Sequence, residues 1–271
     1  MTKPLILAIA NQKGGVAKTT TCESLAATFT AKGLKTLLID MDPQTNASQH
    51  CGYDISVADT PFLTMYEVLS PTKKGATSLS ECIQHCQSFD LAPASNEMAA
   101  LEIELSAKLS VKQLAKAIRN DPVVMETYDI IVIDGGPTQG MLTTNILCAA
   151  TQCLIPTHCS IDSRNAVLTM YETIQDIKSE FNPDLDTLGI AITQYERITK
   201  VGRETKEEVY EIGRQLGLRV FSTEIRRCAA VEKAKKAESN VVAFAPTSAA
   251  AVDYMNLADE IIAALKEKGV L

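Results

Sequence analysis

Short runs of consecutive apolar residues alternate with longer segments of helical periodicity along the whole chain. The run Ile130–Ile133 is apolar at every position, which is typical of a strand covered on both faces. The pattern predicts strands at 4–10, 35–41, 89–93, 129–134, 152–157, 187–193 and 218–222. It predicts helices near 18–32, 62–70, 96–124, 140–150, 161–181, 202–216, 228–237 and 248–268. This alternation predicts an α/β fold with a single doubly wound, mostly parallel sheet flanked by helices.

We expect residues 1–271 to form one domain, because no linker or repeat interrupts this pattern. The first predicted strand begins at residue 4, so we expect no helix-turn-helix domain before it. The net charge of −7 excludes a strongly basic nucleic-acid-binding protein, so contact with DNA requires a local basic patch. No apolar run approaches the ~18 residues of a membrane span. We therefore expect a cytoplasmic protein without a membrane partner.

The chain has eight cysteines, and each of its three histidines directly precedes one of them. These pairs are His50-Cys51, His85-Cys86 and His158-Cys159. A zinc site needs four ligands at workable spacing, and no pair has an evident second half in the sequence. Disulfides are rare in the cytoplasm. We therefore expect the cysteines to act as small buried apolar residues.

Residues 11–20 read Asn-Gln-Lys-Gly-Gly-Val-Ala-Lys-Thr-Thr and lie between a predicted strand and a predicted helix. This is the setting of a phosphate-binding loop. Gly14 and Gly15 allow the backbone to approach an anion, and free N–H groups at a helix start attract negative charge. Lys18 can reach the β- and γ-phosphates of a nucleotide, and the Thr19 hydroxyl can ligate Mg²⁺.

The ordinary pattern of such loops, G-x-x-x-x-G-K-[ST], does not fit this chain, because Gln12 and Ala17 stand where it needs glycines. The deviant pattern K-G-G-x-x-K-[ST] fits, and it makes Lys13 an additional lysine of the loop. The predicted nucleotide-binding residues are Lys13, Gly14, Gly15, Val16, Ala17, Lys18, Thr19 and Thr20.

Aspartates end two of the predicted strands. Asp40 and Asp42 are two residues apart, so we expect both side chains to point to one face at the carboxyl end of the sheet. Asp134 ends a fully apolar strand and is followed by Gly135-Gly136-Pro137. A carboxylate at a strand end beside a triphosphate can orient water or hold Mg²⁺.

Three segments together resemble the nucleotide motifs of ParA-type partition ATPases: Lys13–Thr19, Asp42–Ala47 and Asp134–Pro137. That family is part of the deviant Walker A group, which includes MinD, ArsA and the nitrogenase iron protein. The resemblance runs over nearly the whole chain, since 91–96, 245–246 and 253–254 also look like family segments. The length resembles the short, Soj-like form.

The resemblance implies an ATP hydrolase with ATP and Mg²⁺ as cofactors. It implies a catalytic set of Lys13, Lys18 and Asp42, and a metal-binding set of Thr19, Asp42 and Asp134. Lys13 would reach across an ATP-sandwich homodimer to the partner's phosphates, and Asp42 would position the attacking water. Asp134 would hold Mg²⁺ through water and report the γ-phosphate to the loop that follows it.

The chain departs from the family pattern at two positions. Most ParA proteins have glycine where Ala17 stands, and a positive φ there would cost alanine on the order of 1 kcal/mol. The loop after Asp134 usually reads Asp-x-Pro-Pro, whereas Gly136 replaces the first proline here. We expect this glycine to loosen a loop that should stiffen when ATP binds.

Family members of this kind bind DNA without sequence preference and are stimulated by a centromere-binding, ParB-like adaptor. Residues 196–238 hold 11 basic against 8 acidic residues, so a basic patch stands out from the acidic chain. The candidate DNA contacts are Arg197, Lys200, Arg203, Arg226, Arg227, Lys235 and Lys236. The resemblance therefore implies plasmid or chromosome partition, with association to the nucleoid when ATP is bound.

Two alternatives stay open. A MinD-like membrane switch needs a basic amphipathic C-terminal helix, but the last predicted helix carries Asp253, Asp259 and Glu260. An ATPase that positions a cargo other than DNA would share all of the nucleotide motifs. The choice of cargo depends on the adaptor, which the chain does not contain.

Overall fold

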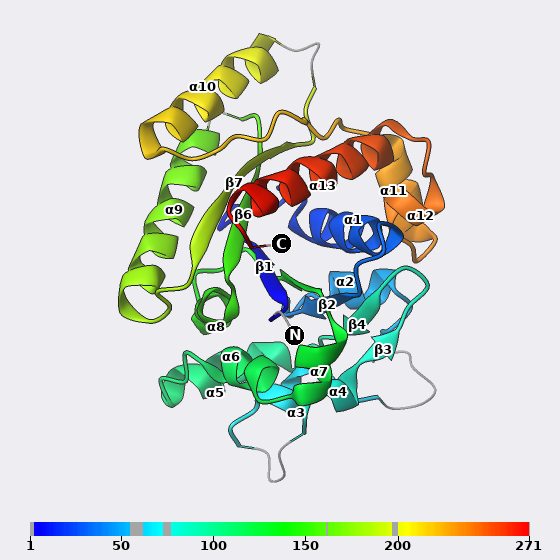
Figure 1. The fold of residues 1–271 in the computed structure, drawn as a ribbon, viewed down its shortest axis with the longest axis vertical. Coiled ribbons are helices and arrows are strands. Elements are labelled where there is room, and N and C mark those ends of the chain that lie inside the picture. Colours follow the sequence, from blue (N-terminus) through cyan, green and yellow to red (C-terminus); the bar gives the residue numbers. More distant parts are fainter. Residues whose placement is uncertain (1–2, 55–61, 73–76, 161, 197–199, 271) are drawn as a thin grey trace.

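The computed structural model describes residues 3–54, 62–72, 77–160, 162–196 and 200–270. Its strands form one seven-stranded sheet in the order β3-β4-β2-β5-β1-β6-β7 (Figure 1). The strands pair in parallel, except that β3 runs antiparallel to β4. They are β1 Leu5–Ile9, β2 Thr36–Asp40, β3 Gln84–His85, β4 Asp90–Ala92, β5 Ile130–Asp134, β6 Gln152–His158 and β7 Asp186–Thr193.

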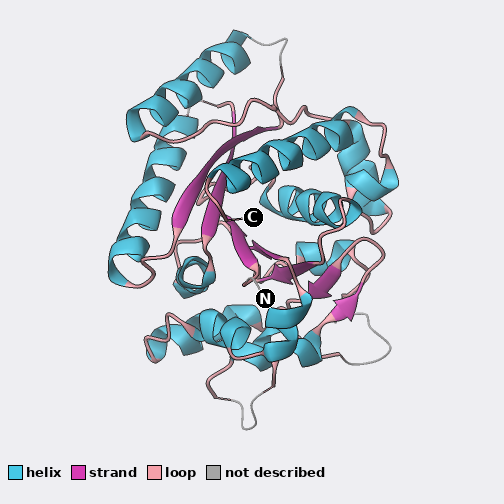
Figure 2. Cartoon of the chain, in the orientation of Figure 1, coloured by secondary structure: helices cyan, strands magenta, loops and turns pink. Residues whose placement is uncertain are grey.

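Helices cover both faces of this sheet, which confirms the doubly wound α/β prediction (Figure 2). Successive β1 side chains point to opposite faces, so Leu7 packs in one core and Ala8 in the other. The core that contains Leu7 lies under α1 Lys18–Ala31, α2 Asn46–His50, α11 Ala229–Lys236, α12 Val241–Phe244 and α13 Ala249–Glu267. The core that contains Ala8 lies against α3 Met65–Leu69, α4 Leu79–Cys82, α5 Met98–Ala107, α6 Gln113–Arg119, α7 Pro122–Thr127, α8 Met141–Ala149, α9 Ser163–Glu180 and α10 Lys200–Leu216.

The predicted strands from 4–10 to 187–193 are confirmed to within one residue at either end. The segment 218–222 is not a named strand, although the Phe221 N–H donates to the Ile190 carbonyl at 2.9 Å. Only a single parallel bridge, between Ile190 and Val220, joins this segment to β7. The sequence did not predict β3, because two residues are too few to show a periodicity.

The single helix predicted over 96–124 is wrong, because the structure has α5, α6 and α7 there. Leu109 ends the first of these with a left-handed backbone, φ 48°. Asp121 then starts α7 by accepting hydrogen bonds from the N–H groups of Val123 and Val124, with Pro122 at the first helical position. Aspartate followed by proline is a helix-start signal that outweighs the apolar periodicity across it.

A side chain from α5 fixes where α8 begins. Both oxygens of Glu102 accept from backbone N–H groups at the start of α8, from Met141 and, at 2.8 Å, from Leu142. A Cβ atom on Gly140 would overlap the Glu102 carboxylate, so this close approach requires glycine. Carboxylates are favourable at a helix N-terminus. The cap therefore anchors the end of the loop that follows Asp134.

Candidate functional site

The phosphate loop joins β1 to α1, as the sequence predicts. Its backbone turns through positive φ at Gly15, 74°, and at Ala17, 59°. Val16 is buried and its carbonyl accepts from Thr193 Oγ1 at 3.1 Å, while the Gly15 carbonyl accepts from Gln194 Nε2 at 2.8 Å. Hydrogen bonds from the end of β7 therefore hold the loop in place, and the start of α1 remains open toward a ligand.

Lys18 is held inside this loop. Its side chain is buried, and Nζ donates to the Lys13 carbonyl at 3.2 Å. Burial lowers the pKa of the Lys18 ammonium, and the nearby carboxylates of Asp134 and Asp42 oppose that shift. A cation with one backbone partner and two carboxylates in its surroundings is well placed to exchange that partner for phosphate oxygens.

Lys13 reaches a different part of the chain. Its Nζ donates to Ser160 Oγ at 2.9 Å and pairs with Asp162 Oδ2 at 3.4 Å, both in the segment after β6. The Asp162 side chain is 76% exposed. An ion pair this exposed contributes only about 0–1 kcal/mol. Lys13 can therefore leave this contact at little cost.

Asp40 is the last residue of β2 and Asp42 lies in the loop beyond it, so the alternation of a strand no longer fixes the direction of the Asp42 side chain. Asp40 is fully buried and accepts from the Asp42 N–H and from Ser48, whose hydroxyl is 2.7 Å away. Burial raises the pKa of the Asp40 carboxyl to about 6. Asp42 instead lines the pocket, and its Oδ1 accepts from the Gln44 N–H at 2.9 Å. Asp40 thus supports the loop, whereas Asp42 faces the ligand space.

The absence of a side chain at Gly136 leaves space for the Asp42 carboxylate. A Cβ atom at position 136 would lie 3.3 Å from Asp42 Oδ1, closer than ordinary van der Waals contact. The loop after β5 therefore approaches the loop after β2 where the family pattern has a proline. This contact gives Gly136 a steric role beside the flexibility that the sequence suggested.

Asp134 is fully buried at the end of β5. Its Oδ1 accepts from Cys22 Sγ at 3.4 Å, but Oδ2 has no hydrogen-bond partner among the described residues. Burial, and then the charge of Asp40, raise the pKa of the Asp134 carboxyl, whereas a hydrogen bond from the Thr19 side chain lowers it. An unpartnered buried oxygen beside a threonine hydroxyl fits a hydrated Mg²⁺, which prefers oxygen ligands.

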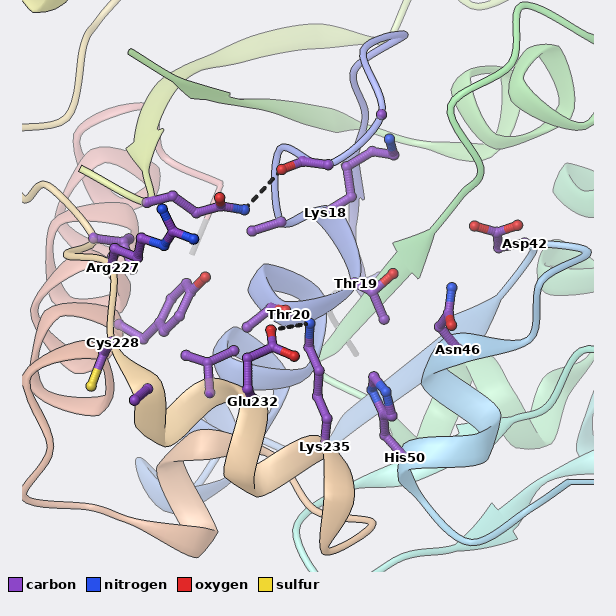
Figure 3. Close-up of a pocket in the computed structure, with 18 of the residues that line it drawn as sticks. Lys18, Thr19, Thr20, Asp42, Asn46, His50, Arg227, Cys228, Glu232 and Lys235 are labelled. Carbon is purple, nitrogen blue, oxygen red and sulfur yellow. Dashed lines mark hydrogen bonds and ion pairs between the residues drawn. The ribbon is translucent and has the colours of Figure 1, made fainter. Parts of the chain in front are cut away.

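A pocket of about 750 Å³ opens over the phosphate loop (Figure 3). It contains the predicted residues Gly14, Gly15, Ala17, Lys18, Thr19, Thr20 and Asp42. Arg227 and Cys228 lie on one side of it in Figure 3, and Asp42 and Asn46 lie on the other, with Thr19 between them. This volume is within the range of small-molecule sites. Gln44, Asn46 and Pro137 also line it, and they belong to the segments that resemble the family's nucleotide motifs. The lining residues that the sequence did not predict are His50, Gln194, Ile225, Cys228, Ala229, Val231, Glu232 and Tyr254.

Three of the basic residues assigned to DNA line this pocket instead: Arg226, Arg227 and Lys235. Arg226 forms a bidentate ion pair with Asp253: Nε donates to Oδ2 at 2.8 Å, and the NH2 nitrogen donates to Oδ1 at 2.7 Å. Arg227 pairs with Glu196 at 2.7 Å, and Lys235 pairs with Glu232 at 3.0 Å. Among the other candidates, Arg203 and Lys236 are exposed, whereas Arg197 and the side chain of Lys200 lie outside the described residues.

The left-handed backbone at position 17 allows us to predict how Ala17→Gly changes the free energy of unfolding. The left-handed region costs a residue with a Cβ atom about 1–2 kcal/mol, and glycine gives back about 0.4–1 kcal/mol through its freer unfolded chain. We expect the variant to be more stable by roughly 0.5 kcal/mol, measured by urea unfolding. Gly33→Ala, at φ 88° in an open turn, is the matched reverse change and should destabilise the protein. A destabilised Ala17→Gly would contradict this assignment of strain.

Known proteins resemble this chain over almost its whole length. Residues 5–187 match the AAA domain family. The sporulation initiation inhibitor protein Soj of Bacillus subtilis is 31% identical over 269 residues, covering 95% of this chain and 98% of that protein. The chromosome partitioning protein ParA of Caulobacter vibrioides is 30% identical over 271 residues, covering 97% and 96%.

Among solved structures, cobyrinic acid a,c-diamide synthase from Mycobacterium smegmatis, with a bound ATP analogue and magnesium, has a TM-score of 0.80. It is 29% identical and covers 97% of this chain and 96% of that one. The fold, the deviant phosphate loop and the full-length similarity to Soj and ParA agree with one another. The chain therefore belongs to the ParA-type, Soj-like family of P-loop ATPases.

Proposed function

We propose that this ATPase drives plasmid or chromosome partition by forming an ATP-sandwich dimer that binds DNA without sequence preference. The observation that carries the proposal is the deviant phosphate loop, with Lys13 held outside its own phosphate site and Lys18 inside it. A ParB-like adaptor on the cargo would stimulate hydrolysis and release the dimer from DNA. The chain would act as one cytoplasmic ATPase domain.

The residues around the pocket suit ATP hydrolysis with Mg²⁺. The N–H groups at the start of α1 and the Lys18 ammonium bind and orient the phosphates. Thr19 and Asp134 would hold Mg²⁺, and the ion would supply positive charge beside the phosphates. Asp42 lies on the pocket wall and positions the attacking water for transfer to the γ-phosphorus.

Lys13 is the residue that would make the site depend on a second protomer. Its present partners, Ser160 and Asp162, belong to its own chain, and the ion pair is weak. The phosphates of a nucleotide bound by a facing copy would offer a stronger, charge-assisted partner. ATP would thus be the ligand that favours dimer formation.

Ion pairs and exposure favour some of the basic residues over others as DNA contacts. Arg226 makes two hydrogen bonds to the buried carboxylate of Asp253, so it is less available to phosphates of the DNA backbone. The Arg227–Glu196 pair is exposed and therefore weak, and Arg227 lines the nucleotide pocket. Arg203 on α10 and Lys236 at the end of α11 are exposed and remain the better candidates. Dimerisation would double these few contacts and give weak binding that depends on salt.

DNA retention on a column or filter tests this proposal directly. We expect retention with ATP that is lost with ADP or without nucleotide, and that falls steeply between low and moderate salt. Arg203→Glu combined with Lys236→Glu should lower the salt dependence by about one unit of slope for each DNA phosphate that is no longer bound. Lys116→Glu, a single charge reversal at an exposed position of α6, should leave retention unchanged. Retention without ATP dependence would count against the partition model.

The membrane alternative gains no support from the last helix. Tyr254, Leu257, Ile261 and Leu265 of α13 are buried against the core, so its apolar face is not free to enter a bilayer. Among the described residues, no helix has the length and apolar character that crossing a membrane requires. Sedimentation with liposomes in the presence of ATP separates the two functions.

A further inference from the structure

Two of the three His-Cys pairs in the sequence come together in the structure. Cys51 ends α2, and Cys86 directly follows β3. The two side chains are neighbours, although 35 positions separate them in the chain. Both thiols are free and half-buried, and both pack against the same core. The expectation that all the cysteines are buried is therefore wrong, since Cys51, Cys86, Cys159 and Cys228 are partly exposed.

The neighbouring histidines are already occupied, which argues against a zinc site. His50 Nδ1 lies 2.7 Å from the buried carboxylate of Glu23. His85 Nδ1 lies 2.7 Å from Asp90 Oδ1, and its side chain is 84% exposed. Within the described ranges, no group of three or more potential ligands is arranged to hold a metal ion. The pair is therefore better understood as two thiols than as half of a metal centre.

The surroundings of the pair hold the two segments close to one another. The Tyr53 hydroxyl, just beyond Cys51, donates to the His85 carbonyl at 3.4 Å. The Cys86 N–H donates to the Phe89 carbonyl at 3.1 Å, which fixes the turn between β3 and β4. Contact with Cys86 and burial both raise the pKa of the Cys51 thiol, so Cys51 is a poorer nucleophile than an exposed thiol.

We propose that Cys51 and Cys86 form a redox-sensitive pair that closes to a disulfide and thereby fastens α2 to the β3–β4 turn. With a disulfide oxidant such as oxidised glutathione, the deprotonated sulfur of Cys86 attacks one oxidant sulfur and displaces one glutathione thiolate. Cys51 then loses its proton, attacks the Cys86 sulfur of the mixed disulfide and displaces the second glutathione thiolate. Two protein thiols are oxidised, one oxidant disulfide is reduced, and the two protons end on the two glutathione thiols.

Such a bond would act on the nucleotide site, because α2 follows the loop that carries Asp42. Ser48 and His50 already tie this short helix to Asp40 and Glu23. A covalent link at its last turn would restrict the movement of the 42–50 segment during turnover. This consequence rests on the proposed role of Asp42, whereas formation of the disulfide does not.

The test uses the full-length chain, first reduced and then incubated with excess oxidised glutathione. Remaining thiols are blocked, and non-reducing peptide mapping by mass spectrometry locates any cross-link. We expect a monomer that has lost two of its eight thiols and contains a peptide joined through Cys51 and Cys86. Dithiothreitol should restore both thiols. Cross-links through other cysteines, stable mixed disulfides at this pair, or no loss of thiols would overturn the proposal.

Variants separate the disulfide from general oxidation. Cys86→Ser and Cys51→Ser should each abolish the cross-link, whereas Cys159→Ser, which removes another half-buried thiol, should keep it. Oxidation should lower ATP turnover of the wild type by about tenfold, and it should not change turnover of Cys86→Ser. A cross-linked protein with unchanged turnover would overturn the regulatory part. Loss of ATP-dependent DNA retention would bear on the partition proposal and not on the disulfide, because mass spectrometry detects the cross-link independently of DNA binding.

Discussion

Asp42→Ala is expected to lower ATP turnover by about 10²–10⁴-fold, the usual contribution of a positioned acid–base group. The mutated side chain lies on the pocket wall, so its loss leaves the attacking water without a partner. Binding should change little, because Lys18 and the loop N–H groups hold the phosphates. Steady-state phosphate release measures turnover, and a fluorescent ATP analogue measures affinity.

Two further variants make this result specific. Asp42→Asn keeps an oxygen for the Gln44 N–H, so it preserves the local turn but should still turn over slowly. Asp259→Ala removes a carboxylate that is 62% exposed and pairs with Lys32 on the surface, and it should retain wild-type turnover. Normal turnover in Asp42→Ala would remove Asp42 from the water-positioning role.

Lys18→Ala is expected to weaken nucleotide binding by about 10²-fold or more. Hydrogen bonds to a charged group contribute about 1.5–3 kcal/mol each, and Lys18 is placed to make them with phosphate oxygens. Removing it also leaves Asp134 and Asp42 without the cation that offsets their repulsion of a polyanion. Isothermal titration calorimetry with ATP measures the loss.

Lys13→Ala is the matched control, because it removes the other lysine of the same loop. Its Nζ points to Ser160 and Asp162, so a single protomer should still bind ATP with near wild-type affinity. Turnover should nevertheless fall, because the residue acts on a second copy. Equal loss of affinity in both variants would argue that Lys13 serves its own site, and wild-type affinity in Lys18→Ala would exclude Lys18 from the phosphates.

The sequence was most informative where local chemistry decides the structure. The uninterrupted apolar run 130–133 predicted a strand covered on both faces, and β5 is buried at every position. The spacing from Lys13 to Thr19 predicted the loop and its place between β1 and α1. The sequence left open whether position 17 needs a positive φ, and Ala17 does adopt one.

Features that depend on distant contacts could not be predicted in this way. Asp40 and Asp42 look alike in sequence, but Asp40 accepts a hydrogen bond from Ser48, whereas Asp42 lines the pocket. The far wall of the pocket comes from α11, and nothing in the sequence between 228 and 236 connects it to a loop more than 200 residues earlier. The proximity of Cys51 and Cys86 likewise depends on packing between segments that are far apart in the sequence.

Glu102, which caps α8, is part of a hydrogen-bonded connection between the two loops that face the ligand, the one that carries Asp42 and the one that follows Asp134. The Ser48 hydroxyl accepts from the Ala94 N–H at 2.9 Å, which ties α2 to the loop after β4. The loop after β4 leads directly into α5, whose Glu102 holds the beginning of α8 and hence the end of the loop after Asp134. A chain of hydrogen bonds therefore links the segment after Asp42, through α5, to the loop after Asp134 without involving the nucleotide.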